Sequence, residues 1–171
     1  MSNGILYRGE IWRFELEPSL SSTVIKDPVN KLLTSGVTLS GASRIAWYKG
    51  EAAFFLKPRL RLLAEQVDIT YTKVSTREAR RRWGSCSSRG NISLNCKLIL
   101  TPEWVSDSII LHELAHRIHH NHSKLFWNKL LEICPRWNEA AKWLEMNYVN
   151  IEKSWYSFGI SHPPLEGGSK R

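Results

Sequence analysis

Residues 112–122 read HELAHRIHHNH, so five histidines and one glutamate fall within eleven residues. Neutral imidazole is a common zinc ligand, and a nearby carboxylate can act as a general base. On an α-helix, positions four residues apart lie one above the other, about 40° apart around the axis. His112 and His116 can therefore direct two nitrogens at one ion, while Glu113 can reach a water bound to that ion. This HExxH arrangement predicts a zinc site that activates water.

Firm zinc binding needs a third protein ligand, with a fourth position left open for water. His122 can supply it if the chain turns at His120–Asn121, because Asn accepts the left-handed conformation of such a turn. The spacing HExxHxxxxxH then matches the zinc ligands of metzincins, although His119 stands where glycine is usual. A downstream glutamate, Glu132 or Glu139, is the second alternative. His119 or His120 comes last, because His119 lies about 10.5 Å along the helix axis from His112.

The helix predicted to carry these residues, EWVSDSIILHELAHRIHH (103–120), is apolar on most sides. A helix of this kind is buried, and each buried polar side chain then needs a partner. The motif could be an accident on a core helix. Three polar residues, His112, Glu113 and His116, would be costly in such a place without a function, so the sequence favours the metal site.

Before this helix, the sequence predicts strands, one helix and a hairpin. Short alternating patches at 9–18 and 35–50 indicate strands, and residues 51–66 indicate a helix that Pro58 weakens or kinks. Residues 67–75 alternate as a strand does. RRRWGSC (80–86) and NISLNCKLIL (91–100) indicate a hairpin around SSRG, in which Gly90 can supply a positive φ.

After the metal helix, Ser123 is a candidate cap for a helix over 124–134, and a last helix covers 137–149. We expect one globular domain in three parts. Residues 1–66 form divergent N-terminal strands and a helix, residues 67–149 form the core, and residues 150–171 form an irregular tail.

The chain carries a net charge of +8, and many of its arginines lie close together. Such clusters attract phosphate backbones or acidic partners, so DNA is a candidate partner. A solvated surface is the alternative explanation. The arginines concerned are Arg77, Arg80, Arg81, Arg82 and Arg89.

Several motifs together resemble the YgjP-like metallopeptidases, relatives of the SprT-like zincins. These motifs are RRWGSCSSRGNISLNCKLIL (81–100), HELAH (112–116), NHSKLFW (121–127) and CPRW (134–137). The resemblance implies an α+β, zincin-like domain with a small mixed sheet packed against the HExxH helix and C-terminal helices. It also implies metal ligands at His112, His116 and His122 and a catalytic glutamate at Glu113.

Two functions follow from these patterns. The first is a zinc peptidase that acts on proteins or peptides, with Glu113 as the general base. The second is a basic nucleic-acid-binding module that keeps a structural metal site. For the peptidase, we expect a substrate to pair along a sheet edge at NISLN, which comprises Asn91, Ile92, Ser93, Leu94 and Asn95.

The sequence also indicates a cellular setting. No apolar run approaches the roughly 20 residues that a membrane span needs. The start of the chain lacks the layout of a signal peptide. Three cysteines, an odd number, suggest reduced thiols and a cytoplasmic protein.

Overall fold

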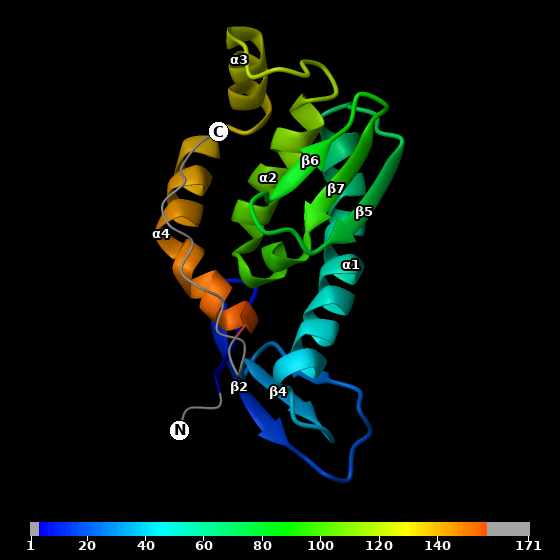
Figure 1. Cartoon of the computed structure of the whole chain (residues 1–171), viewed down its shortest axis with the longest axis vertical. Coiled ribbons are helices and arrows are strands. Elements are labelled where there is room, and N and C mark those ends of the chain that lie inside the picture. The colour runs from blue at the N-terminus through cyan, green and yellow to red at the C-terminus, as the bar shows by residue number, and fades with distance from the viewer. Residues whose placement is uncertain (1–3, 157–171) are drawn as a thin grey trace.

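A computed structural model describes residues 4–156, in which strands and helices mix along the chain and form an α+β fold, as predicted (Figure 1). The elements are β1 (Gly4–Tyr7), β2 (Glu10–Leu16), β3 (Ile25–Asp27), β4 (Leu32–Ser35), α1 (Gly41–Gln66), β5 (Lys73–Arg77), β6 (Gly84–Cys86), β7 (Asn91–Asn95), the 3-10 helix η1 (Cys96–Leu100), α2 (Glu103–Ala115), α3 (Lys124–Ile133) and α4 (Trp137–Tyr156).

The first four strands form a sheet of order β1-β2-β4-β3 at one end of the molecule, far from α3 (Figure 1). The strand predicted within residues 9–18 is confirmed as β2. The strand predicted at 35–50 is wrong beyond Ser35, where β4 ends, and α1 begins at Gly41. Tyr48, Ala52, Leu56 and Leu60 are all fully buried, and this four-residue spacing is that of one helix face. Tertiary burial of that face therefore outweighs the local strand pattern.

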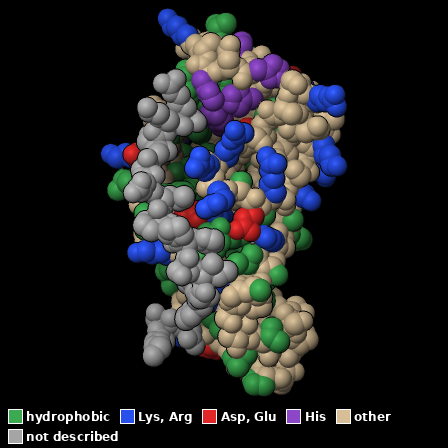
Figure 2. All heavy atoms as spheres, in the orientation of Figure 1, with side chains coloured by type: hydrophobic (Ala, Val, Ile, Leu, Met, Phe, Trp, Pro, Cys, Tyr) green, Lys and Arg blue, Asp and Glu red, His purple; other side chains and the backbone are tan. Residues whose placement is uncertain are grey.

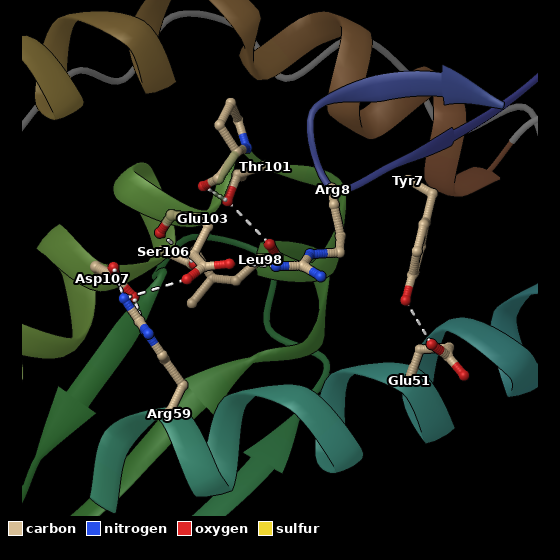
Figure 3. Close-up of polar contacts among 10 residues, drawn as sticks. Tyr7, Arg8, Glu51, Arg59, Leu98, Thr101, Glu103, Ser106 and Asp107 are labelled. Carbon is tan, nitrogen blue, oxygen red and sulfur yellow. Dashed lines mark hydrogen bonds and ion pairs between the residues drawn. The ribbon is translucent and has the colours of Figure 1, made fainter. Parts of the chain in front are cut away.

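Helix α1 continues through Pro58 and packs against α2. The guanidinium group of Arg59 donates to both carboxylate oxygens of Asp107 on α2, at 2.8 and 2.7 Å (Figure 3). Arg8, in the turn between β1 and β2, pairs with Glu103 in the first turn of α2 (Figure 3). These ion pairs tie the N-terminal part of the chain to the helix that carries the HExxH motif.

A second, three-stranded sheet has the order β5-β7-β6 and packs against α2. β6 and β7 are antiparallel and form the predicted hairpin, with Gly90 at φ +80° in its turn. β5 runs parallel to β7, so the sheet is mixed, as expected. The strand predicted at 67–75 instead covers 73–77. The second hairpin strand ends at Asn95, where the Asn95 side chain accepts from the backbone N–H of Lys97 and starts η1.

Helix α4 runs to Tyr156, so the predicted irregular tail is wrong for residues 150–156. Ile151 and Trp155 are buried there, and the ring of Trp155 stacks on that of Tyr48 with centroids 5.5 Å apart. Glu152 binds the ammonium group of the buried Lys97 at 2.6 Å. These long-range contacts extend the helix. The rest of the predicted tail, residues 157–171, lies outside the described residues.

Helix α2 lies between the three-stranded sheet β5-β7-β6, called here the site sheet, and α4. Val105, Ile110 and Leu114 are fully buried along α2. The prediction of a buried helix is thus confirmed, although α2 ends at Ala115, earlier than expected. Within residues 4–156, no helix combines the length and apolar character that a membrane crossing requires.

Candidate metal centre

Three histidines converge at the end of α2. His112 lies in the last turn of α2, His116 caps it, and His122 precedes α3. One ring nitrogen from each lies within 4.8 Å of the others, and His112 Nε2 is 3.2 Å from His122 Nε2. Tetrahedral zinc with Zn–N distances near 2.1 Å places ligand nitrogens about 3.4 Å apart. The His112–His122 separation is close to this value, and three histidine donors would leave a fourth position for water.

The turn that brings His122 back follows directly from the early end of α2. The backbone N–H groups of Ile118 and His119 both donate to the carbonyl of Ala115, which tightens the chain after the helix. The predicted left-handed turn at His120–Asn121 is wrong. The non-glycine residues of positive φ in the described chain are Arg8, Lys31 and Asp68.

Ser123 caps α3, as predicted, because its side chain accepts from the N–H of Phe126. His122 is thus fixed one residue before the N-cap of a helix that packs on α2.

Each histidine ring stacks on an aromatic ring from α3 or α4. His112 faces Trp137 with centroids 4.6 Å apart, His116 faces Phe126 at 4.5 Å, and His122 faces Trp127 at 5.4 Å. Packing of this kind restricts the orientation of each ring and therefore the direction in which its nitrogens point. Sequence reasoning did not assign this role to the aromatic residues, although they lie in the NHSKLFW and CPRW motifs.

Burial also favours the neutral form of His112 and His116. Desolvation lowers the pKa of His112 to about 3, with smaller contributions from His116 and His122. Desolvation lowers the pKa of His116 as well. A neutral imidazole keeps the lone pair that a metal ion needs.

Hydrogen bonding bears on which ring nitrogens face the ion. His116 Nδ1 lies 3.2 Å from the carbonyl oxygen of His119, which suits donation from Nδ1 and leaves Nε2 as the metal-facing nitrogen. His112 Nδ1 is buried and has no hydrogen-bond partner within residues 4–156. Its Nε2 is the nitrogen that faces His122.

Glu113 is buried between α2 and β6, and only 5% of it is exposed. Its carboxylate lies against Gly84, where a Cβ atom would stand 2.5 Å from Glu113 Oε1 and 2.6 Å from Cγ. Only glycine allows the strand to approach the carboxylate so closely. Burial raises the pKa of Glu113 to about 8, and the charge of Arg82 opposes this rise.

Strand β6 is an edge strand of the site sheet. Trp83 and Ser87 bond to β7, through Asn95 N–H to Trp83 O at 2.8 Å and Ser87 N–H to Asn91 O at 2.9 Å. Because antiparallel bonding alternates, Ser85 also faces β7, while Gly84 and Cys86 direct their backbone groups outward. β6 therefore presents free backbone donors and acceptors beside Glu113.

The predicted substrate edge at residues 91–95 is wrong. β7 is the central strand, with β5 and β6 bonded on its two sides. Its backbone groups are already paired, so no peptide can be added there. The sequence carried one signal for the close approach of β6 to Glu113, namely Gly84, whose missing side chain makes room for the carboxylate.

The alternative third ligands do not join the histidine cluster. Glu132 pairs with Lys129 at 2.8 Å, and Glu139 pairs with Arg136 at 2.9 Å. Among residues 4–156, the group that could hold a metal consists of His112, His116 and His122, so neither His119 nor His120 belongs to it.

The arginine cluster divides into two parts. Arg77, Arg80, Arg81 and Arg82 line one pocket of 430 Å³ together with Ala79. Arg89 lies in the hairpin turn, at the other end of β6. Figure 2 shows Lys and Arg side chains gathered beside the histidines on one face of the molecule.

The chain was compared with known proteins. The model of a family described as YgjP-like, metallopeptidase domain, matches residues 2–147. Two crystal structures of metallopeptidase zymogens are similar. Abylysin of Pyrococcus abyssi is 21% identical with a TM-score of 0.48, over 54% of this chain and 94% of that one. Jannalysin of Methanocaldococcus jannaschii is 20% identical with a TM-score of 0.45, over 56% and 94%.

A search of curated proteins found no match. The family match extends from the N-terminal sheet through the HExxH helix and into α4, and therefore includes the histidine cluster and Glu113. On this evidence the chain belongs to the YgjP-like metallopeptidase family.

Proposed function

We propose that this chain is a zinc peptidase in which His112, His116 and His122 hold the metal and Glu113 is the general base. The observation that carries the proposal is the convergence of three histidines beside a buried glutamate. A structural zinc site is typically closed by four protein ligands, whereas three ligands leave a position for water. The donor set thus favours catalysis over a purely structural role.

Zinc bound there would supply a water of lowered pKa and a positive charge facing the carbonyl of the scissile bond. Glu113 takes up a proton from that water on its carboxylate and then delivers it to the leaving amine. Burial raises the pKa of Glu113, and the positive charge of a bound zinc ion would lower it again and favour the carboxylate that accepts the proton.

The substrate backbone would lie along β6. An extended peptide can add to a free strand edge by main-chain hydrogen bonds. The outward backbone groups of Gly84 and Cys86 provide these bonds, and Gly84 lies against the Glu113 carboxylate. Pairing at this edge brings the scissile bond next to the general base.

Gly84→Ala should lower hydrolysis by about tenfold or more while the protein keeps its zinc. The added Cβ would overlap Glu113 Oε1, Cγ and Cδ, so the carboxylate must move away from the substrate edge. A displacement of about 1 Å at a reacting group can cost about 100-fold in rate. Peptide cleavage and zinc content, measured on the same preparation, test this expectation.

Gly50→Ala is the matched control, because a Cβ at Gly50 in α1 meets nothing within 4 Å. It should not reduce activity, and it should stabilise the helix by up to about 1 kcal/mol. Equal activity of Gly84→Ala and Gly50→Ala would refute the close approach of β6 to the catalytic carboxylate.

Removal of metal tests the proposed function as a whole. The purified chain should contain about one zinc ion and should cleave a mixture of unstructured peptides. Chelation should abolish cleavage, and added zinc should restore it, because the water is activated by the metal. Persistent cleavage after complete chelation would rule out the zinc mechanism. A zinc-loaded chain that cleaves no peptide would leave the nucleic-acid-binding module as the better account.

The cysteines support a reducing compartment, and we propose a cytoplasmic location. Cys86, Cys96 and Cys134 are free, and the last two are buried. Burial raises the pKa of each thiol, which reduces the fraction of reactive thiolate.

A further inference from the structure

The pocket formed by Arg77, Arg80, Arg81 and Arg82, called here the arginine pocket, lies at the end of β6 where that strand begins. Arg77 is the last residue of β5, and Arg80, Arg81 and Arg82 lie in the short segment that links β5 to β6. The four arginines are exposed, so the pocket is open to ligands. Because the pocket lies beside the proposed substrate strand, the inference that follows rests on the proposed peptidase function.

Within residues 4–156, no carboxylate forms an ion pair with the arginines of this pocket. Glu78 lies within the same segment, but its carboxylate is bound by Lys49 at 2.9 Å, Trp155 Nε1 at 3.1 Å and Tyr156 Oη at 2.9 Å. The pocket therefore offers its charge to an anionic ligand.

The arginine pocket adjoins the proposed substrate edge. Arg82 precedes Gly84 by two residues, which the backbone can span with at most about 7 Å. The positive charge of Arg82 also lowers the pKa of Glu113, against the larger effect of burial. A peptide that pairs with Gly84 and continues past the start of β6 consequently runs over the pocket.

We propose that the arginine pocket is a specificity subsite that selects peptides carrying Asp or Glu within about three residues of the scissile bond. The guanidinium group presents a rigid fork of N–H donors that matches a carboxylate. Several such groups in one pocket favour a negatively charged side chain over a neutral one. They disfavour Lys and Arg at the same position by repulsion.

The arrangement fits an acidic side chain better than a nucleic acid. A DNA-binding surface spreads its basic residues along the phosphate backbone. Here Arg89 lies at the far end of β6, away from the pocket. Another basic stretch lies at residues 57–61, which read KPRLR, but its Arg59 is paired with Asp107 (Figure 3).

Matched peptides test the proposal. In a neutral peptide that the zinc-loaded chain cleaves, a single Glu or Lys is placed in turn at each of three positions on both sides of the scissile bond. Glu at one or two of these positions should raise kcat/KM by about tenfold, the scale of one hydrogen-bonded charge. In the Arg80→Ala/Arg81→Ala protein, the ratio of acidic to neutral kcat/KM should fall close to one.

Arg89→Ala is the control, since it removes the same type of charge at the other end of β6. It should leave the acidic preference intact, whereas Arg80→Glu/Arg81→Glu should reverse it toward Lys. Cleavage of all peptides with equal kcat/KM would overturn the subsite but not the peptidase. Loss of single-stranded DNA binding in Arg80→Ala/Arg81→Ala, without an acidic preference in the wild type, would assign the pocket to nucleic acid instead.

Discussion

Glu113→Gln should keep its zinc and its fold but lose hydrolysis by a factor of about 100 or more, the scale of a positioned general base. The glutamine amide has nearly the shape of the carboxyl group that it replaces, yet it cannot accept the proton from water. Because Glu113 is buried, replacing it with a neutral side chain removes a desolvation cost, so the melting temperature should not fall.

Single-turnover peptide hydrolysis, zinc content and thermal unfolding of one preparation check this prediction together. Glu132→Gln is the control, because that glutamate pairs with Lys129 away from the histidine cluster. It should cleave as fast as the wild type. A Glu113→Gln protein with full zinc and undiminished hydrolysis would show that another group carries the proton.

His112→Ala, His116→Ala and His122→Ala should each weaken zinc binding by at least about 100-fold, more than changes among the outer partners of ligands usually do. Each substitution leaves two of the three nitrogens that lie within 4.8 Å of one another. Two protein ligands cannot hold zinc in a tetrahedral site of this kind. Zinc affinity, measured by competition with a chelator of known affinity, provides the readout.

His119→Ala and His120→Ala are the matched controls on the same segment. His119 approaches the site through its backbone carbonyl, which accepts from His116 Nδ1 and is kept in the alanine variant. Both variants should therefore bind zinc nearly as tightly as the wild type. Tight binding in His122→Ala, or its loss in Glu132→Ala or Glu139→Ala, would replace His122 by a carboxylate ligand.

Two of the predictions that failed share one physical origin. Residues 41–50 read as a strand locally, but Tyr48 and Ala52 belong to a stripe of α1 that is buried from Tyr48 to Ala64. Residues 150–156 read as a tail, but Ile151, Glu152 and Trp155 make contacts with segments far away in the sequence. In both cases tertiary packing stabilises a helix whose local sequence is ambiguous.

The sequence alone determined the pairing of His112 with His116 and the place of Glu113, because helix geometry fixes the relation between neighbouring turns. It also determined the β6–β7 hairpin, whose turn depends on residues that are adjacent in the chain. Only the tertiary structure decided which strand is the edge, because this depends on β5 pairing with β7 from a distant segment. The approach of His122 and the aromatic rings that hold the ligands likewise depend on how α3 and α4 pack on α2, which no local spacing specifies.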